Sequence, residues 1–123
     1  MRAIVGVGPV VAAWILAEVG DIRRFPSMSH FAAANGTAPI PAESGRVRRH
    51  RLNRGGNRRL NRALHAIALI QSRVDPRAKA YLERRRSEGK SRREAVRCLK
   101  RHLSNVIYRR MLADDDETYG STT

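Results

Sequence analysis

The sequence predicts an all-α domain, and three observations lead to that prediction. Apolar residues recur at three- and four-residue intervals in two long stretches, one from Asn57 to about Arg73 and one after Ser91. Prolines stand where helices are expected to begin and glycines where they are expected to end. The one long stretch without a helical period, residues 37–56, is interpreted as a basic loop or hairpin. At 123 residues the chain is long enough for one such domain.

The first predicted helix covers residues 9–19. Pro9 suits its first position and Gly20 the position just past its end. Its residues are nearly all apolar, so we expect the helix to belong to the core. Trp14 and Leu16 are expected to be its largest contributors.

Four further helices complete the predicted fold. A short helix runs from Pro26-Ser27 to Asn35, and a longer one covers about residues 57–73. A third covers about residues 76–88, and Ser91 with Glu94 forms a capping box that opens the last. The apolar face of the 57–73 helix consists of Leu60, Ala63, Leu64, Ile67 and Ile70. That of the last helix consists of Val96, Leu99, Leu103, Val106 and Ile107, with basic residues opposite.

The charge balance points to a polyanionic partner. The chain has 25 Lys and Arg against 11 Asp and Glu, and four of those acids lie in residues 114–117. A nucleic acid is the first expectation and an anionic membrane surface the second. We therefore expect a basic domain over residues 1–113, followed by a disordered acidic tail over 114–123.

Cysteine and hydropathy patterns narrow the protein class. The single Cys98 excludes an intramolecular disulfide and a thiolate zinc site. The four histidines and the acids show no metal-ligand spacing, so we predict no metal site in this chain. No apolar run is long enough to span a bilayer, and the first residues lack a signal-peptide pattern. These features predict a soluble protein of a reducing compartment such as the cytoplasm.

The densest charge lies in residues 46–62, where eight arginines fall in seventeen positions without a carboxylate. These are Arg46, Arg48, Arg49, Arg51, Arg54, Arg58, Arg59 and Arg62. Burial is excluded because each guanidinium would need a partner that the segment lacks. Gly55 and Gly56 allow close approach of a ligand, and the helix starting at Asn57 offers free amides to a phosphate. We predict that the run binds nucleic acid. A solvated charged loop, or an arginine bias from GC-rich coding, is the alternative.

A second candidate is the turn Gly6-Val7-Gly8-Pro9, which leads directly into an apolar helix. It is similar to the hairpin of a helix-hairpin-helix element, in which Gly6 and Gly8 would turn the chain and the helix amides would hold a DNA phosphate. Only five residues precede the turn, so the first helix of such an element is missing. An ordinary helix entry is the alternative.

Ser44 stands immediately before the arginine run, next to Gly45. From the residues alone, a Ser-Gly pair in a proline-rich loop is a turn. A hydroxyl at this place could also attack a phosphodiester, because nearby guanidinium groups would stabilise the charge that builds on phosphorus.

Six short blocks follow one another along the chain. They are Gly6-Val7-Gly8-Pro9, Leu16-Ala17-Glu18-Val19-Gly20-Asp21, Arg24-Phe25, Phe31-Ala32-Ala33 with Gly36-Thr37-Ala38-Pro39, Ser44-Gly45, and Arg54-Gly55-Gly56-Asn57-Arg58. In order and spacing, over about residues 4–112, they resemble the transposases of the IS110 insertion-sequence family, the group of IS116 and IS902. Members of that family pair an N-terminal RuvC-like domain, which carries an acidic metal-binding tetrad, with a C-terminal domain that carries a serine nucleophile. They act as DNA recombinases guided by a structured RNA.

The resemblance implies that this chain corresponds to the C-terminal domain. Ser44 would then be the nucleophile that forms a phosphoserine link to DNA. The segment through Gly55-Gly56-Asn57 would contact nucleic acid. The implied partners are the element's DNA ends and target, a guide RNA and further copies of the protein. Mg²⁺ would bind in the RuvC-like domain and not in this chain.

Two departures from the family pattern qualify this expectation. Val5 stands where a proline often precedes the glycine turn, and the RuvC-like half is absent. We therefore expect a fragment that is incomplete on its own, which leaves open whether the chain is an enzyme. The alternative function is a non-catalytic helical DNA- or RNA-binding module of ribosomal-protein type. Binding to a membrane surface is disfavoured, because the arginine run lacks interleaved large apolar residues.

Overall fold

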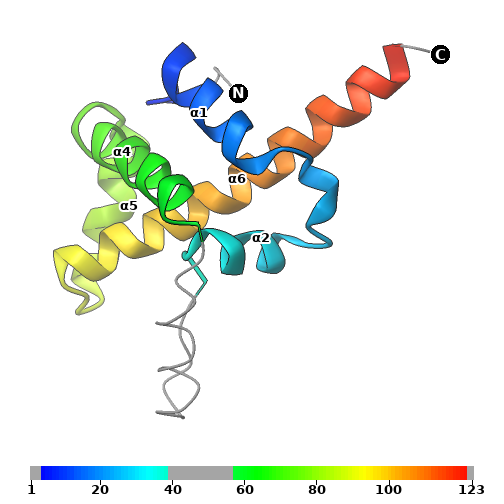
Figure 1. Cartoon of the computed structure of the whole chain (residues 1–123). Coiled ribbons are helices and arrows are strands. Elements are labelled where there is room, and N and C mark those ends of the chain that lie inside the picture. The colour runs from blue at the N-terminus through cyan, green and yellow to red at the C-terminus, as the bar shows by residue number, and fades with distance from the viewer. Residues whose placement is uncertain (1–3, 39–56, 122–123) are drawn as a thin grey trace, which may run out of the picture.

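The computed structural model describes residues 4–38 and 57–121, and for this part of the chain the all-α prediction is confirmed (Figure 1). The two described ranges contain five α-helices and one 3₁₀ turn, and no strand. In chain order these are α1 (Pro9–Val19), η1 (Ile22–Arg24), α2 (Met28–Asn35), α4 (Arg58–Val74), α5 (Pro76–Ser87) and α6 (Arg92–Ser121). Most of the expected basic loop, residues 39–56, lies outside the described residues, so that element stays a prediction.

Local capping explains where most helices begin. The side chain of Ser27 accepts a hydrogen bond from the amide of His30 at the start of α2. Asn57 and Asp75 cap α4 and α5 in the same way, accepting from Leu60 and Arg77. At the start of α6 the predicted capping box is confirmed: the Glu94 amide donates to Ser91 Oγ, and the Ser91 amide donates to Glu94 Oε1.

The longest helix, α6, runs across the molecule and carries most of the packing (Figure 1). Helices α2, α4 and α5 and the turn η1 all pack against it, whereas α1 packs mainly on α4. The core therefore lies along α6, where α2 and α4 pack against it. Its largest fully buried apolar side chains are Phe31, Ile15, Leu60, Leu64, Ile67 and Ile107.

Two residues expected in the core are exposed. Leu16 is 49% exposed and Ile70 is 40% exposed. Trp14 is half-buried and packs at the edge of the core. In α1 the buried side is formed instead by Ala12, Ile15 and Val19. A helix that is apolar on all sides gives no periodicity from which to choose its buried face, and this explains the error at Leu16.

The C-terminal segment differs from the expected disordered tail. Helix α6 continues through the acidic residues to Ser121. The guanidinium of Arg23 in η1 donates to Asp115 over 2.7 Å and also forms an ion pair with Asp116. Asp115 is thus paired with a cation 92 residues earlier in the chain. Local sequence patterns could not predict this contact.

One polar cluster is buried between α2 and α6. Asn35 is fully buried, and its side-chain nitrogen donates to Ser104 Oγ over 2.9 Å. Its side-chain oxygen accepts from both the amide and the hydroxyl of Thr37. Each of these groups has a partner, as buried polar atoms require. The cluster fixes the end of α2 on α6.

Candidate nucleic-acid interface

Ser44, Arg46, Arg48, Arg49, Arg51, Arg54, Gly55 and Gly56 lie outside the described residues, so their predicted roles stay predictions. The described residues that flank this segment lie close together. The Asn57 amide donates to the carbonyl oxygen of Ala34 over 2.6 Å, and the Asn61 side chain donates to the carbonyl oxygen of Asn35 over 2.9 Å. The chain therefore leaves α2 and enters α4 at one place on the surface.

The side-chain amide group of Asn57 is hydrogen-bonded through both its oxygen and its nitrogen. Its oxygen accepts from the Leu60 amide, and its nitrogen donates to Glu18 Oε1 over 3.0 Å. The amides of Asn57 and Leu60 are therefore already used within the protein. Asn57 therefore positions the start of α4. The predicted contact between this helix start and a phosphate stays a prediction, and it would use other amides of the first turn.

The three described arginines of the run are exposed at the start of α4. Arg59 lies 3.8 Å from Glu18, with its side chain 77% exposed. Arg58 and Arg62 form no ion pair with any described carboxylate. They are one helical turn apart and therefore lie on one face of α4. Both side chains are exposed, so this face of α4 is open to solvent.

A groove that sequence reasoning missed lies between α4 and the first half of α6. It has a volume of about 550 Å³, and we call it the α4–α6 groove. It is lined by His65, Leu69, Arg92, Arg93, Val96, Arg97 and Lys100. Four of these seven side chains are Arg or Lys. The sequence showed that the last helix has a basic face, but only the packing of α4 beside it forms a groove.

Lys100 is the cation set deepest in this groove. Its ammonium group donates to Asn61 Oδ1 over 2.9 Å and forms no ion pair with a described carboxylate. Burial lowers the pKa of Lys100, and the nearby Arg97 lowers it further. A half-buried ammonium group without an anionic partner is poorly compensated. A bound phosphate would supply the missing charge.

The glycine turn packs against the body of the protein. Gly6 has φ +91°, and a Cβ there would meet the Ile67 carbonyl oxygen at 3.3 Å. Close packing on α4 thus accounts for Gly6 without a ligand. Gly8 caps α1 and has open space around its Cα. Its predicted phosphate contact, and the helix-hairpin-helix interpretation, stay predictions.

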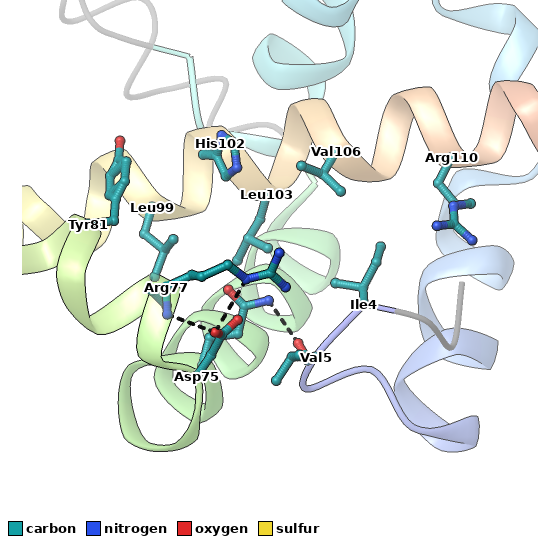
Figure 2. A pocket seen from close by; sticks show the side chains of 12 residues that line it. Ile4, Val5, Asp75, Arg77, Tyr81, Leu99, His102, Leu103, Val106 and Arg110 are labelled. Carbon is teal, nitrogen blue, oxygen red and sulfur yellow. Dashed lines mark hydrogen bonds and ion pairs between the residues drawn. The ribbon is translucent and has the colours of Figure 1, made fainter.

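A second concavity, of about 350 Å³, lies between the N-terminal segment, α5 and α6 (Figure 2). Gln71, one of the residues that line it, donates to the carbonyl oxygen of Val5. Asp75 accepts from the amide of Arg77 (Figure 2). These polar groups are engaged in holding the N-terminal segment and capping α5. The concavity is explained by the fold, and we assign it no chemistry.

The described part of the chain contains neither a metal-binding cluster nor a membrane-spanning helix. No group of three or more His, Cys, Asp or Glu side chains is arranged to hold a metal ion there. No helix in this part is both long enough and apolar enough to cross a membrane. His65 and His102 are both exposed.

Comparison with known proteins identifies the family. The family model for transposases of the IS116/IS110/IS902 family matches residues 1–83. The 42 kDa protein of insertion element IS900 from Mycobacterium paratuberculosis is 38% identical over 120 residues, which cover 96% of this chain and 30% of that protein. The 43.6 kDa protein of IS110 from Streptomyces coelicolor is 36% identical over 104 residues, or 84% of this chain and 26% of that protein.

The 44.8 kDa protein of IS116 from Streptomyces clavuligerus is 31% identical over 105 residues, or 84% of this chain and 26% of that protein. No solved structure gives a significant match. The chain therefore spans less than a third of the length of these relatives. The family match extends over more than half of the chain, and high-coverage relatives support it. This chain belongs to the IS116/IS110/IS902 family of insertion-sequence transposases.

Proposed function

We propose that this chain serves DNA transposition, as the nucleic-acid-binding and serine-bearing part of an insertion-sequence transposase. One observation carries the proposal: the family match over residues 1–83 includes Ser44 and the whole arginine run. The exposed Arg58 and Arg62, which have no carboxylate partner among the described residues, support contact with a phosphate backbone. Because the chain spans less than a third of its relatives, we propose that it acts with the remaining parts of such a protein.

In the proposed reaction the Ser44 hydroxyl attacks the phosphorus of a DNA phosphodiester. A phosphorus–oxygen bond forms to serine as the bond to one deoxyribose oxygen breaks, and the departing oxygen takes up a proton as the serine hydroxyl loses one. No oxidant or reductant is needed. Arginines of the run would stabilise the charge on the transferring phosphoryl group. Mg²⁺ would be held by the acidic tetrad of a RuvC-like domain, as the family resemblance implies.

A covalent adduct tests the nucleophile. The chain, combined with a RuvC-like domain of the family, the element's DNA ends and the guide RNA, is expected to yield a protein–DNA adduct that survives denaturation. Ser44→Ala is expected to abolish the adduct. The matched control Ser29→Ala removes an exposed hydroxyl from α2 and is expected to leave the adduct unchanged. An adduct that persists in Ser44→Ala would rule out Ser44 as the nucleophile.

A second candidate is a nucleic-acid-binding module without catalysis. The described cations favour it independently of Ser44, because exposed arginines and the α4–α6 groove need no serine to bind phosphates. If Ser44→Ala retains every measurable activity while Arg58→Ala and Arg62→Ala weaken binding, this function is the better description. Filter binding with the element's DNA and its RNA would separate the two candidates.

A further inference from the structure

The α4–α6 groove combines positive charge with an apolar surface. Arg92, Arg93 and Arg97 line it from α6 and are all exposed. None of the three forms an ion pair with a described carboxylate. The acid nearest in sequence, Glu94, is occupied by the capping box. The cations of the groove therefore have no anionic partner within the described protein.

The groove also has apolar and ring surfaces at its centre. Leu69 from α4 is half-buried, and Val96 from α6 is nearly fully buried. His65 lies between Leu69 and the start of α4 and offers an exposed imidazole ring. A groove that served only phosphates would gain nothing from these groups. Apolar and imidazole surfaces between cations suit the flat face of a nucleotide base, with its phosphates on the surrounding cations.

The groove joins the arginine face at the start of α4. Arg58, Arg62, His65 and Leu69 are spaced by four, three and four residues, so they follow one face of the helix. Asn61, next to Arg62, accepts the hydrogen bond from Lys100 on the opposite wall. A strand lying along this face would pass from Arg58 and Arg62 into the groove without a break.

We propose that the α4–α6 groove binds an unpaired nucleic-acid strand, with its phosphates on Arg92, Arg93, Arg97 and Lys100 and a base against Leu69 and His65. Duplex fits less well, because its bases are stacked inside and would leave the apolar surface uncovered. The proposal rests on the nucleic-acid-binding function proposed above, and assigns to it a second site, outside the arginine run. Unpaired DNA and unpaired RNA share the required chemistry.

The charge of the groove can be tested by equilibrium binding of the full chain to fluorescent single-stranded DNA, single-stranded RNA and duplex DNA of equal length. Arg92→Gln with Arg93→Gln and Arg97→Gln is expected to weaken single-strand binding at least tenfold. It should also reduce the slope of log affinity against log salt by about 2, since each phosphate contact to a single strand contributes about 0.7. The matched control is Lys79→Gln with Arg84→Gln and Arg86→Gln, three exposed cations of α5. The control is expected to lose less than about threefold through net charge alone.

The apolar surface has its own test. An oligonucleotide with abasic positions keeps its phosphates but offers no base, so the wild-type chain is expected to bind it about tenfold more weakly, as for the loss of a stacked base. In Leu69→Ser this preference is expected to shrink. Placement is tested by thiol crosslinking in a Cys98→Ser background. Leu69→Cys should crosslink to a thiol-bearing single strand, and Lys79→Cys should not.

Three outcomes would overturn the inference. They are equal loss in the groove and α5 triple variants, equal loss of duplex and single-strand binding in the groove triple variant, and no selective crosslink at position 69. A wild-type chain that binds no nucleic acid and forms no Ser44 adduct would overturn the proposed function as well. If the adduct forms while the groove variants behave like the control, only the groove assignment fails. The relative affinities for single-stranded DNA and single-stranded RNA show which of the two the groove binds.

Discussion

Ser104 and Lys100 lie one turn apart on α6, but they differ in how well the protein satisfies their polar groups. Ser104 is fully buried and receives a hydrogen bond from Asn35, whose other groups are bound by Thr37. Lys100 is half-buried and has only the amide oxygen of Asn61. The buried cluster is satisfied by the protein itself. The groove has charges that the described protein leaves uncompensated.

This difference separates residues that stabilise the fold from residues whose charges are available to a ligand. Burying a polar group without a partner costs free energy, so a complete internal set indicates a structural role. A set of cations without carboxylates is costly to place together unless water or a polyanion compensates it. Variants in the cluster should therefore change stability, and variants in the groove should change binding.

The largest expected effect is at Asn35. Asn35→Ala removes the amide that satisfies Ser104 and Thr37 and leaves a small cavity. We expect the free energy of unfolding to fall by about 3 kcal/mol, the sum of a cavity and unpaired buried groups. Urea denaturation followed by circular dichroism measures the change. Nucleic-acid affinity of the molecules that remain folded should stay within about twofold, since an effect confined to folding leaves the groove intact.

Asn105→Ala is the matched control for this prediction. Asn105 follows Ser104 on α6, and its side-chain oxygen is buried without a hydrogen-bond partner in the described structure. Removing an unsatisfied amide should cost less than about 1 kcal/mol or stabilise the protein. Equal losses in the two variants would show that the Asn35 cluster is no more important than any other amide on these helices.

The two glycines of the N-terminal turn give the next largest effect. Gly6 has a positive φ and little space for a Cβ, whereas Gly8 has φ −90° and open space. Gly6→Ala should lower the free energy of unfolding by about 1–2 kcal/mol, the cost of a left-handed backbone for an L-residue. Gly8→Ala should change it by less than about 1 kcal/mol, because Ala is only a poorer N-cap than Gly. Thermal unfolding of the two variants side by side measures both.

The same pair of variants tests the helix-hairpin-helix interpretation. If the turn binds a phosphate, Gly8→Ala should weaken DNA binding while the protein stays folded. If the turn is only a packing element, Gly8→Ala should leave binding unchanged and Gly6→Ala should affect stability alone. A loss of binding in Gly8→Ala without a loss of stability would therefore show that this turn contributes to binding and not only to packing.

The helix boundaries could be predicted from the sequence because they are set locally. Ser27, Asn57, Asp75 and Ser91 each cap a helix with their own side chain, within three residues. Such contacts need no knowledge of the rest of the fold. The nearly uniform apolar character of α1 had the opposite effect, because it left the buried face undetermined and led to the error at Leu16.

The groove and the acidic end of α6 could not be predicted because each depends on contacts distant in sequence. Lys100 meets Asn61 across 39 positions, and Arg23 meets Asp115 across 92. The sequence showed a basic helix face and an acidic segment, but not what lies beside them. The assignment of Ser44 has a different basis, because it depends on the family resemblance. Ser44 itself lies outside the described residues.

The smallest expected effect is at Glu94, the carboxylate of the capping box that opens α6. The hydrogen bond from the Ser91 amide holds the pKa of the Glu94 carboxyl below its ordinary value, and Lys90 and Arg97 lower it further. Because the folded-state pKa lies below the unfolded one, the stabilisation is present above the ordinary pKa of 4.5 and is lost as pH falls through the folded-state pKa. Glu94→Gln keeps the hydrogen bond but not the charge.

We therefore expect the difference in urea midpoint between wild type and Glu94→Gln to be small and constant near neutral pH, and to shrink in acid. Glu83→Gln on α5 controls for the loss of one exposed negative charge. At neutral pH Glu94→Gln should also bind a single strand slightly more tightly, by about twofold, because it removes a carboxylate that interacts electrostatically with Arg97. Weaker binding in this variant would mean that the capping box, and not the charge of the groove, controls the strand.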